Sequence, residues 1–172
     1  MQSSGKHWQN TTGEIPNKVT AEVLQMDTKN MALLLSDDFI RYRLGRSSSL
    51  TPPSRETETL RRVGKEIEEK YEICLNGLVN SLKFDPEKNG KEAFTECLDS
   101  MFQEGPCNWG RIVMVYVLAA RLAKHCDDRG KPECVDALVT LSGTYVDEKL
   151  TPWIEKQGGW VREKCETIMI KM

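Results

Sequence analysis

Histidine is scarce in this sequence, with only His7 and His125 among 172 residues. No Glu-x-x-His pair occurs, which excludes the carboxylate di-metal sites of helical bundles. Neither a zinc-ligand spacing nor a phosphate-binding loop is found, and the serines cluster in loops without a histidine partner. His125, Cys126 and Cys134 are conceivable metal ligands, but a helix end followed by a turn explains them better. We therefore expect no enzymatic activity, no metal site and no cofactor.

The sequence also lacks a hydrophobic run long enough to cross a membrane. Its most apolar segment, Ile112–Ala120, has nine uncharged residues between two arginines, whereas a spanning helix needs about 20. The amino-terminal region contains no apolar core of a signal peptide, so residues 1–28 are interpreted as a polar and mobile lead-in. Taken as given, the sequence predicts a soluble protein.

The sequence has no large excess of basic or acidic residues. The 24 basic and 26 acidic residues give a net charge of −2, which argues against a nucleic-acid-binding protein. The six cysteines are even in number, but neither a C-x-x-C pair nor a secretory signal accompanies them. We expect reduced thiols in an intracellular protein.

Strand patterns are nearly absent, whereas apolar residues recur at helical spacing over most of the chain. We predict an all-α domain over residues 29–172, a single bundle of about eight helices around the apolar helix 108–125. Asn108 and Thr151 are expected to cap helices, and Gly77 to mark a bend or break. The other predicted helical segments are 30–44, 54–82, 91–103, 133–149, a short helix after Thr151, and 160–172.

Four segments resemble the homology motifs of the B-cell lymphoma two (Bcl) family of apoptosis regulators. NWGRIV at 108–113 resembles the first motif, and WIEKQGGW at 153–160 resembles the second, about 40 residues further along. ETLRRVG at 58–64 resembles the third motif, most closely in the myeloid-cell-leukaemia branch, and LLLSDDFIRYRL at 33–44 resembles the fourth. The resemblance implies about eight helices around a buried central hairpin, the fold already indicated by the apolar pattern.

The resemblance also implies a surface groove that accepts the amphipathic third-motif helix of a pro-apoptotic relative. Gly110 would let that helix approach closely, at about 0.5–1 kcal/mol in helix propensity. Arg111 would pair bidentately with the aspartate of the incoming motif, and Asn108 would cap the central helix and bond the same aspartate. Packing, a solvated charge and a simple cap are the structural alternatives for these three residues.

The remaining groove residues follow from positions that match the family pattern. Glu104 lies at the predicted rim, where it would attract a basic residue of the partner. Trp109, Trp153 and Trp160 are expected to be structural. The apolar walls and floor, each of which could equally belong to the core, are predicted to be Tyr71, Leu75, Leu78, Leu98, Met101, Met114, Val115 and Leu118.

Both pro-survival and pro-apoptotic members of the family carry these motifs, so departures from the pattern decide between them. Glu56 stands where the third motif has its first apolar anchor, and Lys65 stands where it has its aspartate. As a ligand, this motif would miss an anchor and reverse a charge, which costs several kcal/mol when desolvated. We therefore expect a pro-survival protein that sequesters the third-motif helices of pro-apoptotic relatives and prevents permeabilisation of the outer mitochondrial membrane.

Two alternatives stay open at this stage: a pore-forming pro-apoptotic protein of the same fold, and an unrelated helical bundle that binds a small ligand. The resemblance further implies a cytoplasmic protein that reaches the outer mitochondrial or endoplasmic reticulum membrane if the natural chain has a carboxy-terminal anchor. No nucleic-acid partner is expected.

Overall fold

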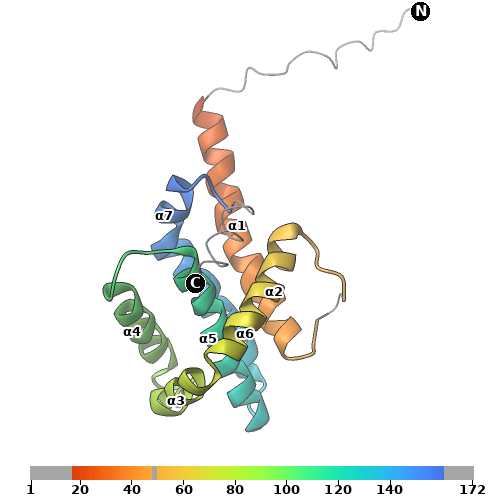
Figure 1. Cartoon of the computed structure of the whole chain (residues 1–172), viewed down its shortest axis with the longest axis vertical. Helices are drawn as coiled ribbons and strands as arrows, with labels where there is room; N and C mark the ends of the chain where they lie inside the picture. Colours follow the sequence, from red (N-terminus) through yellow and green to blue (C-terminus); the bar gives the residue numbers. More distant parts are fainter. Residues whose placement is uncertain (1–16, 48–49, 161–172) are drawn as a thin grey trace, which may run out of the picture.

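The computed structural model describes residues 17–47 and 50–160, which form an all-α domain without strands in these ranges (Figure 1). The predicted fold class is confirmed, and the predicted last helix, 160–172, falls almost entirely outside the described residues. No described helix is both long enough and apolar enough to span a bilayer. The helices are α1 Asn17–Arg43, α2 Arg55–Lys70, α3 Glu72–Leu82, α4 Gly90–Gln103, α5 Trp109–Asp128, α6 Glu133–Tyr145, the π-helix η2 Val146–Leu150, and α7 Thr151–Lys156.

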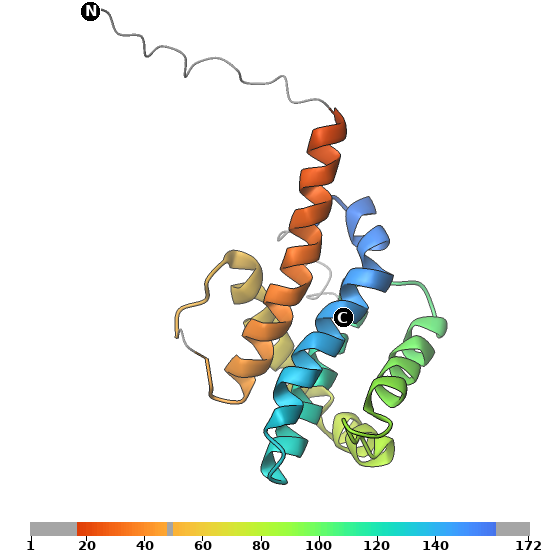
Figure 2. The ribbon, with the colours of Figure 1, turned by 180° about the vertical axis from the view of Figure 1, so that it is seen from behind.

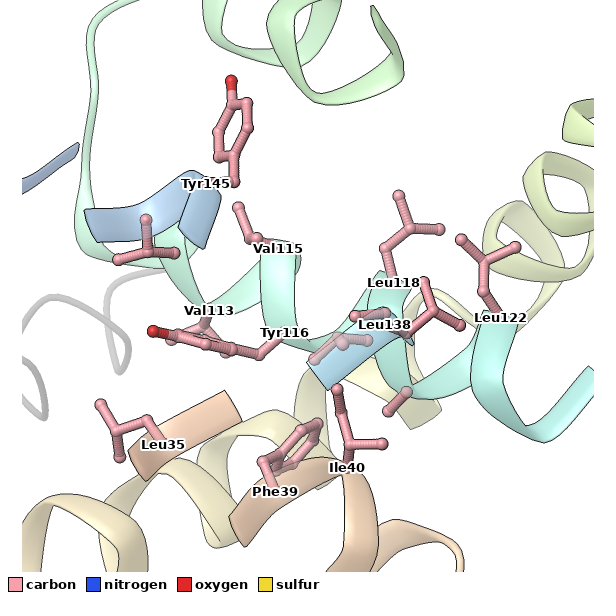
Figure 3. Packing of buried hydrophobic residues seen from close by; sticks show 14 of the residues in the cluster. Leu35, Phe39, Ile40, Val113, Val115, Tyr116, Leu118, Leu122, Leu138 and Tyr145 are labelled. Carbon is pink, nitrogen blue, oxygen red and sulfur yellow. The ribbon is translucent and has the colours of Figure 1, made fainter. Parts of the chain in front are cut away.

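Helix α5 is the centre of the bundle, as its uniformly apolar sequence predicts. All of its residues from Val115 to Ala120 are buried. Figure 3 shows its side chains Val113 and Tyr116 next to Leu35 and Phe39 of α1. The hydroxyl of Tyr116, which has no access to solvent, donates to the carbonyl of Ala32 at 3.0 Å. A buried phenol therefore keeps a hydrogen-bond partner inside the core.

Helices α1 and α6 run side by side, although about a hundred residues separate them in the chain (Figure 2). The Ser36 hydroxyl lies 2.6 Å from the carbonyl oxygen of Val139 and 2.6 Å from the hydroxyl of Ser142. A β-carbon added to Gly143 would lie 2.6 Å from a methyl group of Leu33. Small residues thus let the two helices approach closely and pair their buried hydroxyls.

Several helix boundaries differ from the prediction. Helix α1 begins at Asn17 instead of Asn30, so the predicted lead-in is helical from that residue onward. The break between α2 and α3 falls at Tyr71, and Gly77 lies inside α3. Thr151 is not a cap, because α6, η2 and α7 follow one another without a gap. Its hydroxyl instead reaches the carbonyl of Val146 at 3.5 Å.

Candidate peptide-binding surface

The start of α5 carries the polar residues that the first motif supplies. Asn108 has an extended backbone, and its side-chain oxygen accepts from the backbone N–H of Arg111 at 2.9 Å. This is the predicted N-cap, and it satisfies one of the free N–H groups of the first turn. The cap uses only the oxygen of the amide group. The nitrogen of Asn108 therefore keeps its capacity to donate to an incoming acceptor.

Arg111 joins the start of α5 to the end of α4. Its Nη1 donates to the carbonyl of Met101 at 2.7 Å, a group that the end of α4 leaves without a helical partner, and to that of Gly105, just after the helix, at 3.2 Å. The Nε and Nη2 groups bond to none of the described residues. These two groups form one edge of the guanidinium, and Nη2 would lie 3.0 Å from a β-carbon added to Gly105.

Four of the predicted apolar site residues are partly accessible. They come from three different helices and the α2–α3 junction, and all of them pack against the core. An exposed acidic residue, Glu104, follows directly after α4. The accessible apolar residues are Tyr71, Leu78, Met101 and Met114.

Five other predicted site residues are buried in this structure. Leu98 and Val115 are fully inaccessible, Leu75 and Leu118 are 2% and 1% exposed, and Gly110 is also buried. These residues form the layer beneath the accessible ones. Contact between any of the twelve predicted residues and a peptide stays a prediction.

The sequence did not predict the contacts that hold α4 against the rest of the bundle. Asp99 accepts from the hydroxyl of Tyr145 at 2.9 Å and from Nζ of Lys149 at 2.9 Å. Both hydrogen bonds lower the pKa of Asp99, and the bond from Lys149 has the larger effect. Phe102 stacks on the Tyr145 ring with centroids 6.1 Å apart. The pairing residues lie 46 and 50 positions away in the chain, and no local pattern reveals such a separation.

The first and second motifs meet in an aromatic cluster. The Trp109 ring is fully buried, 5.2 Å from the Trp153 ring and 5.5 Å from the Trp160 ring between centroids. The Trp109–Trp153 pair is close to perpendicular, which is a favourable edge-to-face arrangement. The predicted structural role of the three tryptophans is confirmed. Among the described residues, the indole N–H of Trp109 has no hydrogen-bond partner.

The third motif faces the interior. Leu60 and Val63 of α2 are 6% and 3% exposed. A β-carbon added to Gly64 would lie 2.4 Å from the Phe39 ring, so the two helices are in direct contact at this position. Lys65 points outward and is exposed. The apolar anchors of this motif are therefore buried in the core of the bundle.

Ion pairs also fix the third motif. Arg61 donates to both carboxylate oxygens of Asp38, at 2.7 and 2.9 Å, and its guanidinium carbon lies 4.5 Å from the centre of the Tyr42 ring. Glu68, also buried, accepts from Arg43 at 2.6 Å. Withdrawing α2 from the bundle would break both pairs and leave charged groups without partners, which costs several kcal/mol for each pair.

Comparisons with known proteins agree with this architecture. Residues 60–160 match the family model of apoptosis regulator proteins, Bcl-2 family. Bcl-2-like protein 1 of Sus scrofa is 31% identical over 67% of this chain, and the match covers 51% of that protein. The apoptosis regulator BAX of Bos taurus is 28% identical over 87% of this chain and 81% of its own length.

A solved structure shows the same fold. The zebrafish pro-survival protein NRZ, in complex with Bad BH3, has a TM-score of 0.74 at 23% identity, covering 86% of this chain and 98% of that one. The chain spans about half the length of the Bcl-2-like protein 1 relatives that it matches. Since the family model matches more than half of the chain and the helices adopt this fold, the chain belongs to the Bcl-2 family of apoptosis regulators.

Proposed function

We propose that this chain is a pro-survival member that binds the third-motif helix of pro-apoptotic relatives over α3, α4 and the start of α5. The observation that carries this proposal is the chain's own third motif. Its apolar anchors Leu60 and Val63 are buried in the core, and it has Lys65 where the family has an aspartate. A motif in this state is poorly suited to act as a ligand, which favours the role of receptor.

The binding mode follows from the accessible groups. Apolar residues at i, i+3, i+4 and i+7 of the incoming helix would cover Tyr71, Leu78, Met101 and Met114. Its aspartate would pair with the Nε–Nη2 edge of Arg111, which is held in position by its bonds to α4. The Bad BH3 complex of NRZ, a protein of the same fold, supports this assignment.

Calorimetric titration with a panel of synthetic third-motif peptides tests the proposal. We expect nanomolar binding to some peptides and a loss of roughly tenfold or more for Arg111→Ala. Arg129→Ala is the matched control, because it removes an exposed arginine just beyond the opposite end of α5. Absence of binding across the panel, or an equal loss in both variants, would contradict the proposal.

The match to BAX supports a second candidate, a pore-forming pro-apoptotic protein, because it covers 81% of that relative's length. Leakage of dye from liposomes that model the outer mitochondrial membrane distinguishes the pro-survival function from the pore-forming one. A pro-survival protein suppresses leakage caused by an activated pro-apoptotic relative, whereas a pore former causes leakage itself.

We also propose that the protein acts at the outer mitochondrial membrane and belongs to the myeloid-cell-leukaemia branch. The ETLRRVG segment supports the branch assignment. Fractionation of cells that express the natural protein tests the location. Preferences across the peptide panel, compared with those of known members of each branch, test the assignment.

A further inference from the structure

A polar hollow of about 310 Å³ lies between α3 and the carboxy-terminal half of α5. It is separate from the predicted peptide-binding residues, none of which lines it. Val79 of α3 forms an apolar part of its wall. The other lining residues are Asn76, Asn80, Arg121, Lys124, His125 and Asp128.

Arg121 is the most firmly positioned cation of this hollow. Its side chain is 17% exposed, Nη2 donates to the side-chain oxygen of Asn76, and Nη1 lies 3.5 Å from Glu68. Glu68 is already bonded to Arg43 at 2.6 Å. One carboxylate therefore faces two guanidinium groups, and this cluster keeps a net positive charge beside the hollow.

The neighbouring residues of α5 that line the hollow are one cation, one carboxylate and one imidazole. Lys124 and Asp128 form a solvent-exposed pair at 3.4 Å, a contact of little strength. Burial, and then the charge of Arg129, lower the pKa of His125, while Asp128 acts in the opposite direction. On the α3 side, the residues that line the hollow contribute two amides and no ionisable group. An anion placed here would gain donors from both helices and would favour protonated His125.

We propose that this hollow binds a phosphate monoester, either as a soluble metabolite or as the headgroup of a lipid. A monoester carries up to two negative charges and three terminal oxygens, which suit donors that converge from two helices. Its negative charge favours the charged form of the neighbouring imidazole, so proton uptake by His125 accompanies binding. This site is independent of the proposed peptide-binding surface.

NMR of the His125 ring during titration with glycerol phosphate, at constant ionic strength, tests the proposal. We expect saturable shifts and a rise in the pH midpoint of His125, with His7 as an internal reference. Lys124→Gln should weaken binding about tenfold. Lys156→Gln, which removes an exposed lysine from α7, should leave it unchanged. Thermal unfolding confirms that both variants are folded. Shifts that sodium acetate reproduces, or an equal loss in both variants, would overturn the proposal.

A sedimentation assay distinguishes a lipid headgroup from a soluble ester. It uses vesicles of phosphatidylcholine, with and without phosphatidic acid. Binding to the phosphatidic acid vesicles that Lys124→Gln weakens and Lys156→Gln preserves identifies a lipid headgroup. Saturable glycerol phosphate binding without vesicle binding identifies a soluble ester. Absence of both overturns the proposal.

Discussion

Arg111 combines an observed contact with a proposed one. Its Nη1 group donates to two carbonyls at the end of α4, and its Nε–Nη2 edge is the proposed partner of the ligand's carboxylate. Arg111→Lys keeps the positive charge but removes the planar fork. We expect peptide affinity to fall about tenfold and the stability of the free protein to fall by about 1 kcal/mol. Calorimetric titration measures the affinity and thermal unfolding measures the stability. Unchanged affinity would show that the positive charge alone is sufficient for peptide binding.

Two glycines in neighbouring helices should respond in opposite ways to alanine. At Gly64 the new methyl group would lie 2.4 Å from Phe39, whereas at Gly77 it would meet nothing within 4 Å. Gly64→Ala should destabilise the fold by about 1–3 kcal/mol through overpacking. Gly77→Ala should stabilise it by about 0.5–1 kcal/mol through helix propensity. Chemical denaturation of the two variants checks both signs.

At the residue scale, the sequence predicted the cap at Asn108 correctly but could not predict how deeply each apolar residue is buried. Asn108 caps α5 as predicted, because the N-cap preference is local and has its own sequence signature. The apolar positions were ambiguous, since Leu98 and Met101 share the same helical periodicity. The structure buries the first and leaves the second partly accessible. Periodicity indicates which face of a helix is apolar, but the neighbouring helices decide how deeply each residue is buried.

Helix α4 is fastened to α6 and η2 by a pH-dependent contact. The bonds from Lys149 and Tyr145 lower the pKa of Asp99 below its ordinary value of 3.8. The stability from this contact is therefore complete above that value and lost as the pH falls through the lower pKa of the folded state. Because Asp99 and Lys149 are 39% and 45% exposed, we expect at most about 1 kcal/mol.

Hydrogen exchange of the α4 amides, corrected for the intrinsic effect of pH, measures this contribution. Protection in the native protein should fall as the pH drops below 3.8, the ordinary pKa of this carboxyl group. Asp99→Asn should remove the dependence and lower protection at neutral pH. Glu96→Gln, an exposed change on the same helix, should leave the profile intact. Identical profiles in all three proteins would show that Asp99 does not fasten α4.

Some helix boundaries are marked by turn residues in the sequence, and others are not. Helices α4 and α5 begin and end close to their predicted positions, because turn residues flank them. The break at Tyr71 has no glycine or proline and falls inside a continuous apolar pattern, so only tertiary packing defines it. The π-helix η2 likewise has no sequence signature. It lets the chain pass from α6 into α7 without the expected cap at Thr151.

The described part of the chain shares one hydrophobic core, and this predicts one cooperative unfolding transition. The buried hydrophobic residues of α1 to α7 form a single cluster. With Trp8 replaced by Phe, the emission comes from the three clustered tryptophans at the start of α5 and near α7. Unfolding followed by this emission should coincide with unfolding followed by circular dichroism at 222 nm, which reports helix content. Two separated midpoints would mean that part of the bundle unfolds independently.

The pairing of α1 with α6 has a consequence for synthesis. Ser36 and Ser142 are 106 residues apart in the chain, and a ribosome adds about 5–20 residues per second. Helix α1 is therefore made several seconds before its main partner exists. During that interval Leu35, Phe39 and Ile40, which the finished fold buries completely or almost completely, have no α6 to cover them. The nascent chain is thus a substrate for chaperones until α6 has left the ribosome, and its yield in cells depends on their supply.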